Sequence, residues 1–312
     1  MRQSKHALKL VGLLAVLGGP AMAQEQANAP GAKTGTTFRF EGKVGAEYNS
    51  NVAVSDLDTN TGEGDWAATI NALAEATFVP VEKLTFRAGY DFSQSLHQEF
   101  DAFDLAIHRG YGEAAYDFDL VTVGVLGNLA QANLDGDEYL TLTQVQPYLS
   151  KQFGNSLFLR AAYSATEKEF EGRPQRDATA DAVQLDGYVF LDGVQRYVVL
   201  GGRATEEDAT AAEFDYSSWL ARARFVQRFD AFDQNLTFRA GVEYEDRDYD
   251  NVTPLIGTPR SDKRTVADAQ IDIPLGETFF SEISYRYGRF ESNLASADYD
   301  EHVGAVKLGV KY

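Results

Sequence analysis

Charged side chains recur at every second residue along several stretches of the chain, separated by apolar or small residues. Successive residues of a β-strand point to opposite faces, so each such series gathers its charges on one face. If the strands close into a barrel, these charges line the interior and influence which solutes pass. The candidate lining residues are Arg39, Glu41, Lys43, Arg87, Asp91, Arg109, Glu113, Arg222, Arg224, Arg239, Glu243 and Arg286.

The sequence offers few side chains for catalysis. Nucleophilic catalysis needs a base beside a serine or threonine, and the only histidines beyond residue 23 are His97, His108 and His302. We expect His97 in a loop and the other two at strand ends, on the lipid-facing side. There is no G-x-S-x-G motif, zinc-type histidine cluster or P-loop, and the acidic run 133–138 fails the calcium-loop pattern. The sequence therefore predicts no enzyme, no cofactor and no metal site.

The stretch Asp300–Tyr312 shows most clearly how such residues are positioned. Gly304, Val306, Leu308, Val310 and Tyr312 occupy every second position, with polar residues such as Lys307 and Lys311 between them. This is the alternation of a strand with one apolar and one polar face. A strand that ends on an aromatic residue resembles the C-terminal recognition strand of bacterial outer-membrane barrels.

The same alternation begins at Thr37, Trp66 and Leu84 and continues to the end of the chain. Fourteen strands are expected in all, with long connections after odd strands and short turns after even ones. This is typical of an all-β, transmembrane, antiparallel up-and-down β-barrel with short periplasmic turns and long extracellular loops. Strands of about 12 residues argue against a soluble sandwich, in which strands average ~5–6 residues. The other expected strands are 105–117, 120–132, 139–152, 156–168, 180–191, 194–204, 214–229, 236–246, 263–275, 278–290 and 299–312.

Aromatic residues gather at both ends of the expected strands, as two interfacial girdles would require. Those near the short turns are Phe78, Phe118, Phe153, Phe190, Phe229 and Phe279. Those near the long loops are Tyr48, Trp66, Phe92, Tyr163, Trp219, Tyr244 and Tyr287.

Composition and the N-terminal residues are consistent with an exported barrel. Residues 1–23 have the basic start, short apolar core and Ala-Met-Ala end of a signal peptide. We expect residues 24–36 to form a flexible periplasmic segment and residues 37–312 to form the barrel. The chain has no cysteine, and its net charge of −19 becomes −22 once the signal is removed, which argues against nucleic acid as a partner.

Two short motifs resemble a known family. They are the stretch Gly45–Val52, with sequence GAEYNSNV, and the stretch Phe103–His108, with sequence FDLAIH. With fourteen expected strands, they resemble the barrel of the surface lipoprotein assembly modifier family, also called Slam or DUF560. The resemblance implies a translocator of surface lipoproteins. That family carries a periplasmic TPR domain before its barrel, and only a short linker precedes the barrel here.

Two functions follow as hypotheses for a protein of the bacterial outer membrane. The first is a transport pore or translocator with a charged lumen. The alternative is a structural or surface-interaction barrel, whose acidic extracellular loops bind lipopolysaccharide, cations or a partner protein. The expected partners are membrane lipid, lipopolysaccharide, the barrel-assembly machinery through the C-terminal strand, and a secreted or periplasmic protein.

Overall fold

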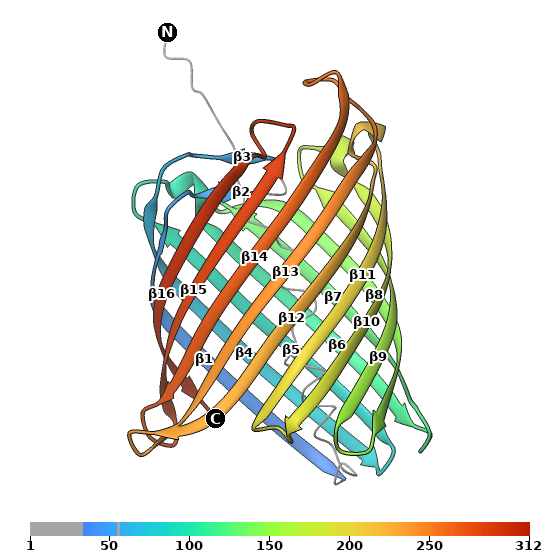
Figure 1. Ribbon diagram of the computed structural model, residues 1–312, viewed down its shortest axis with the longest axis vertical. Coiled ribbons are helices and arrows are strands. Elements are labelled where there is room, and N and C mark those ends of the chain that lie inside the picture. Colours follow the sequence, from blue (N-terminus) through green and yellow to red (C-terminus); the bar gives the residue numbers. More distant parts are fainter. Residues whose placement is uncertain (1–33, 55–56) are drawn as a thin grey trace.

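The computed structural model describes residues 34–54 and 57–312. They form a closed barrel of fourteen antiparallel strands, each paired with its neighbour in the chain, so the expected up-and-down barrel is confirmed (Figure 1). The wall strands are β1 (Gly35–Asn49), β4 (Asp65–Val81), β5 (Leu84–His97), β6 (Leu105–Asp117), β7 (Thr122–Leu134), β8 (Asp137–Phe153), β9 (Leu157–Phe170), β10 (Ala178–Asp192), β11 (Arg196–Ala209), β12 (Tyr216–Ala231), β13 (Gln234–Thr253), β14 (Thr258–Pro274), β15 (Phe279–Ser292) and β16 (Tyr299–Lys311).

Small elements lie in the connections at one end of the barrel. Strands β2 (Ala53–Val54) and β3 (Thr59–Asn60) form a two-stranded ribbon between β1 and β4. The 3-10 turns η3 (Asp101–Phe103), η4 (Pro174–Arg176) and η5 (Ala212–Phe214) occupy three further connections at that end. We call this the long-loop end; the other is the short-turn end, where the C-terminus lies (Figure 1).

The barrel closes where β1 pairs with β16. Pairing runs from Glu41 opposite Lys311 to Asn49 opposite Val303. Tyr312 adds two further backbone hydrogen bonds, because its N–H donates to the carbonyl of Phe40 and its carbonyl accepts from the Phe40 N–H. The C-terminal strand therefore completes the wall, as its alternation predicts.

The alternating apolar residues lie on the outer face. Phe38 and Leu308 are 64% and 59% exposed, and Ile70 and Phe86 are exposed as well. Aromatic side chains pair on this face near both ends, as Tyr48 does with Trp66 and Phe78 with Phe86. An apolar surface of this extent would be costly in water, and a bilayer satisfies it.

The prediction that Phe190 belongs to the outer aromatic girdle is wrong. Phe190 lies on the inner face of β10 and packs against a buried cluster that includes Tyr188 and Tyr197. The even residues of β10 face inward, because Asp186 and Tyr188 are buried while Val183 and Leu185 are exposed. An aromatic residue beside a tight turn can thus close the end of the interior as well as contact lipid.

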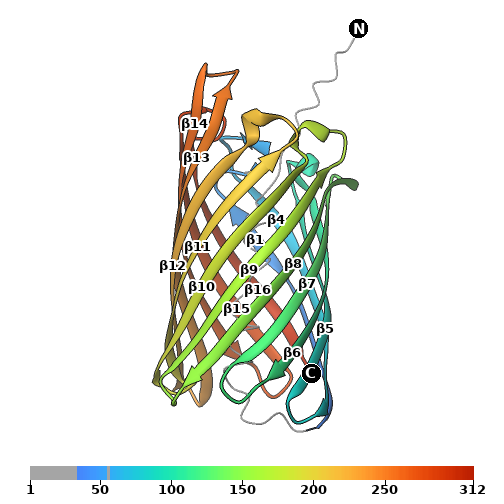
Figure 2. The same ribbon diagram turned by 90° about the vertical axis from the view of Figure 1, so that its right-hand side faces the viewer.

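Two connections at the long-loop end are shorter than expected. The expected loop 247–262 is a hairpin whose strands β13 and β14 continue to Thr253 and Thr258. The expected loop 133–138 is a two-residue turn at Asp135 and Gly136, both with positive φ, as a primed hairpin turn requires. The fifteen-residue first loop, 50–64, is therefore the longest connection at this end. The hairpin of β13 and β14 rises above the rest of this end (Figure 2).

Within the described residues, no helix is long and apolar enough to cross a membrane. The expected signal peptide, 1–23, lies outside the described residues, as does most of the expected periplasmic segment 24–36. Strand β1 begins at Gly35, two residues before the expected start of the barrel.

Candidate functional site

The twelve candidate lining residues all lie on wall strands and on the face opposite the exposed apolar residues. Arg39, Glu41 and Lys43, for example, alternate with the exposed Phe38, Phe40 and Val44. In a closed barrel this face is the inside. Eleven of the twelve form hydrogen bonds or ion pairs there, and Glu243 forms none with the described residues.

A buried cluster joins β4, β5, β6 and β8. Arg87 is 6% exposed and lies between two buried carboxylates, 4.0 Å from that of Glu75 and 3.7 Å from that of Glu113. The Tyr148 hydroxyl donates to Glu113 at 2.6 Å, and the Tyr111 hydroxyl donates to Glu75. Charged groups removed from water persist when they are paired and hydrogen-bonded in this way.

Glycines on neighbouring strands fix these tyrosines. Tyr148 is paired across strands with Gly124, and Tyr111 with Gly89. A Cβ on either glycine would come within 2.3 Å of the tyrosine ring. Each tyrosine ring therefore packs over a glycine of the adjacent strand. Its hydroxyl thereby reaches a carboxylate one strand further along the wall.

The inner face of β10 to β14 carries three cross-strand ion pairs. Arg222 donates to Asp186 at 2.6 Å, Arg224 to Asp268 at 3.1 Å and Arg239 to Asp272 at 2.5 Å. The side chains of both members of the Arg224–Asp268 pair are about one-third exposed, so water reaches this part of the interior. These pairs place opposite charges side by side along the wall.

The interior near the closure is paired too. Lys43 lies 3.1 Å from Glu282 and 3.5 Å from Glu41, which in turn accepts a hydrogen bond from Arg39. On the same face, Arg286 on β15 lies 2.9 Å from Glu301 on β16. Arg109 and Asp91 form a similar pair between β6 and β5.

The long-loop mouth is not a polar ring throughout. On β6 to β9 its inner wall is apolar, and the buried residues Ile107, Leu140, Leu142 and Phe170 form one cluster there. The first loop folds onto this cluster, where Val52 is 0% and Leu57 is 6% exposed. The loop thus extends from the closure side of the barrel to the facing wall and narrows the mouth.

Ion pairs hold the tip of this loop. The carboxylate of Asp58 lies 2.7 Å from Arg260 on β14 and 2.8 Å from Arg176 in η4. Burial alone would raise the pKa of Asp58, but the two guanidinium groups outweigh it and hold the pKa below its ordinary value. Asp65 at the loop's end accepts backbone N–H groups from Glu99 and Phe100.

Several inward-facing residues at the long-loop end are not predicted from the sequence. A second network links Lys168, Glu207 and Tyr216 to Arg247 and Glu245. The sequence predicts a loop at Arg247, because the expected strand ends at residue 246. The alternation of Glu243, Glu245, Arg247 and Tyr249 continues past that point and is the signal that could have placed it. Nothing in the sequence marks Arg176 as a partner of Asp58.

The expected positions of the histidines are partly corrected. His108 and His302 lie on the outer face, with Nδ1 2.6 and 2.7 Å from the hydroxyls of Tyr90 and Tyr285. His97 is the last residue of β5, not a loop residue, and its side chain is buried beside Asp104. Within the described part of the chain, no group of three or more potential metal ligands is arranged to hold an ion.

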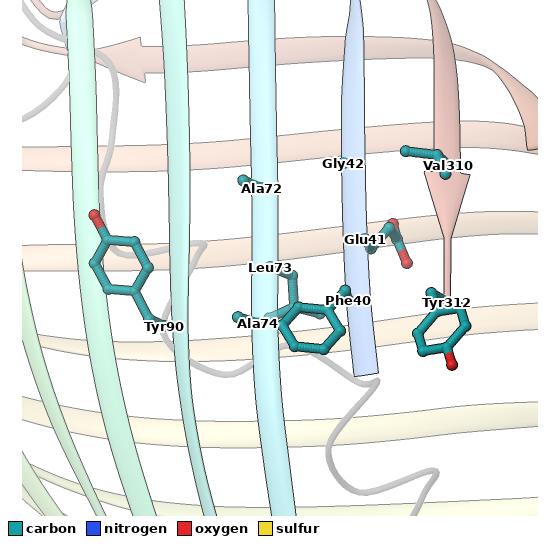
Figure 3. A pocket seen from close by; sticks show the side chains of 9 residues that line it. All are labelled: Phe40, Glu41, Gly42, Ala72, Leu73, Ala74, Tyr90, Val310 and Tyr312. Carbon is teal, nitrogen blue, oxygen red and sulfur yellow. The ribbon is translucent and has the colours of Figure 1, made fainter. Parts of the chain in front are cut away.

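A shallow apolar groove of about 340 Å³ crosses the wall at the closure (Figure 3). Small residues, Gly42, Ala72 and Ala74, form its floor, while Phe40 and Tyr312 flank it. It opens on the apolar outer face of the wall.

These features define a porin-like β-barrel of the bacterial outer membrane. Residues 194–312 match the family described as "Putative beta-barrel porin 2". No curated protein matches the sequence.

Solved structures share the fold. The loop L8 deletion mutant of OmpT, an outer membrane protein of Vibrio cholerae, is similar with a TM-score of 0.53 at 10% identity, over 89% of this chain and 99% of that one. An anion-selective porin from Comamonas acidovorans is similar with a TM-score of 0.51 at 7% identity, over 90% and 100% of the two chains. Identities this low show a common fold and nothing finer.

Proposed function

We propose that this barrel is a passive transport pore with a charged lumen and that it catalyses no reaction. The observation that carries the proposal is the wall itself, apolar outside and lined inside by charged residues from β1 to β16. Fourteen strands enclose more space than the eight whose side chains already fill a barrel. The short turns would face the periplasm and the long loops the exterior, as in other barrels of this membrane.

The paired charges shape the expected selectivity. Each luminal arginine of β12 and β13 named above has an aspartate beside it, so the wall attracts neither sign strongly. Weak ion preference and a conductance limited by the first loop are expected. The residues that would line the path of the solute are the twelve candidate lining residues.

Single-channel recording in planar bilayers tests the proposal. Purified barrel should give conductance steps, and shortening the loop 50–64 should make them larger. If neither the intact nor the loop-shortened barrel conducts, the pore is excluded. We also expect β16 to be the segment that the barrel-assembly machinery recognises.

A translocator of lipoproteins is a second candidate, favoured by one contact. The two stretches that resemble the Slam barrel meet at the mouth, where Val52 packs in one cluster with Phe103 and Ile107. A shared motif that positions a mouth loop fits a gated passage. Surface display of a lipoprotein reporter, compared in cells with and without the barrel, tests it; equal display would contradict it.

A third candidate is a surface-interaction barrel that binds lipopolysaccharide through cations, and it rests on one pair of carboxylates. Asp181 and Glu206 are directly opposite each other on β10 and β11, and both are exposed on the outer face. Like charges in this position are destabilising, and a divalent cation shared with a lipid phosphate would relieve that. Thermal stability in lipopolysaccharide should then fall on chelation, and the double change D181N/E206Q should remove the effect.

A further inference from the structure

A polar hollow lies on the inner wall of β8 to β13, nearer the long-loop end. Its own volume is only about 50 Å³, room for one functional group of a solute, and it opens into the lumen. We define it by six of its lining residues: Gln146, Ser164, Thr166, Gln184, Arg203 and Thr205. Apart from Arg203, all of these are uncharged hydrogen-bonding side chains; the charged residues Lys168, Glu207 and Glu245 line the rest of the hollow.

The neighbouring residues make this stretch of wall concave. Ala180 and Ala182 alternate on the inner face of β10, opposite Thr166 and Ser164 of β9. Above and below, larger apolar side chains project from the same strand β9, Phe170 towards the long-loop end and Phe158 towards the short-turn end. Short side chains between two bulky clusters leave a recess in which a small solute is in reach of polar groups.

Arg203 is the unusual residue of this recess. No carboxylate oxygen among the described residues lies within 4.0 Å of its guanidinium group, and its Nε atom is buried without a hydrogen-bond partner. Arg222, on the next strand, is by contrast fully engaged with Asp186. The nearby Glu245 is taken up by Arg247 and Arg264. Arg203 therefore has no ion-pair partner, although the carboxylates of Glu243 and Glu245 act on it from a longer range.

The remaining polar groups offer both donors and acceptors. The Gln146 carbonyl accepts from Arg160, which leaves its amide N–H groups free, and the Gln184 amide donates to Asp186, which leaves its carbonyl free. Within residues 57–312, the hydroxyls of Ser164 and Thr205 make no hydrogen bond. Such mixed groups match the hydroxyls of a sugar, which donate and accept alike.

We infer that the hollow is a solute-binding site of the proposed pore, specific for a small polyhydroxylated monocarboxylate, that is, a sugar acid. The carboxylate would pair with Arg203 in a charge-assisted, bidentate contact, and the hydroxyls would bond to the amides and hydroxyls around it. The carboxylates of Glu207 and Glu245 at the rim disfavour a second negative charge on the solute. This inference rests on the pore for its biological sense, but the site is defined without it.

Titration calorimetry on the purified barrel with D-gluconate tests the site, with D-glucose and acetate as comparison solutes. Gluconate should bind, and R203Q should weaken it by about tenfold or more, the loss expected for a hydrogen bond to a charged group. The matched control is R196Q, the same substitution on the exposed outer side of β11, which should bind gluconate as the parent protein does.

Each result is decisive for the site and separate from conductance. Gluconate that does not bind, that binds R203Q as well as the parent, or that binds no better than acetate and glucose would overturn the inference. A barrel that binds gluconate through Arg203 but gives no conductance steps would retain the site and exclude the pore. Conductance without gluconate binding would retain the pore and exclude the site.

Discussion

Asp58, at the tip of the first loop, lies 2.7 Å from Arg260 on β14, three strands from the point where that loop leaves the wall. Asp58 is 8% exposed, and its other oxygen lies 2.8 Å from Arg176 between β9 and β10. One carboxylate thus joins two parts of the rim to a loop that starts at a third. The loop's position over the mouth depends on this junction and on the burial of Val52 and Leu57.

Replacing Asp58 by Asn should release the loop. Removing one member of a buried ion pair costs about 3–5 kcal/mol, because the opposite charges stay buried. The loop 50–64 should then exchange its amide hydrogens faster, and single-channel conductance should rise or fluctuate more. Hydrogen exchange and bilayer recording measure the two effects.

Glu63→Gln is the matched control for that change, because Glu63 is an exposed acid of the same loop. It should leave exchange and conductance as they are. If D58N and E63Q behave alike, the ion pairs do not hold the loop.

The position of the loop should also depend on pH. Because the pKa of Asp58 is lowered in the folded protein, its contribution is fully present above the ordinary carboxyl pKa of about 4 and is lost as pH falls through the lowered value. Conductance should therefore rise on acidification below about pH 4 and be flat above it. In D58N this acid-dependent component should disappear; if it persists, other groups control the mouth.

Arg87 should be essential to the stability of the wall. Its change to Met leaves the buried carboxylates of Glu75 and Glu113 without this cation, a loss of about 3–5 kcal/mol. The temperature at which the barrel loses its heat-modifiable gel mobility should fall. Adding E75Q and E113Q to R87M should restore part of it, whereas R39M, at a half-exposed side chain, should change little.

The wall could be predicted from sequence because period-two alternation determines which face each residue takes. All twelve candidate residues lie on the inner face for that reason, and Phe38 and Leu308 on the outer one. The rule fails where a strand's length is the question. Strand β13 runs seven residues further than expected, because Arg247–Thr253 resembles a polar loop in composition.

Period-two alternation does not predict contacts between segments that are distant in the sequence. Acidic extracellular loops suggest a surface for cations or partners, yet Asp58 of the first loop pairs with arginines of the same chain, 118 and more residues away. Alternation predicts one polar face, yet the apolar residues Ile107 and Leu142 line the mouth on that face, where the first loop covers them. Neither contact leaves a local pattern, since each depends on the curvature that brings the rims together.

Gly124 should be required for the inner cluster although it carries no side chain. A Cβ there would come within 2.3 Å of the Tyr148 ring, so Gly124→Ala must displace that ring and break its 2.6 Å hydrogen bond to Glu113. Crowding of this kind costs about 1–3 kcal/mol, and the unfolding temperature should fall. Gly112→Ala, on the neighbouring strand with open space around the new methyl, is the control and should be nearly neutral. Because the damage acts through the ring, G124A should cost little once Tyr148 is already Ala, and a fully additive double mutant would show that the glycine acts by some other route.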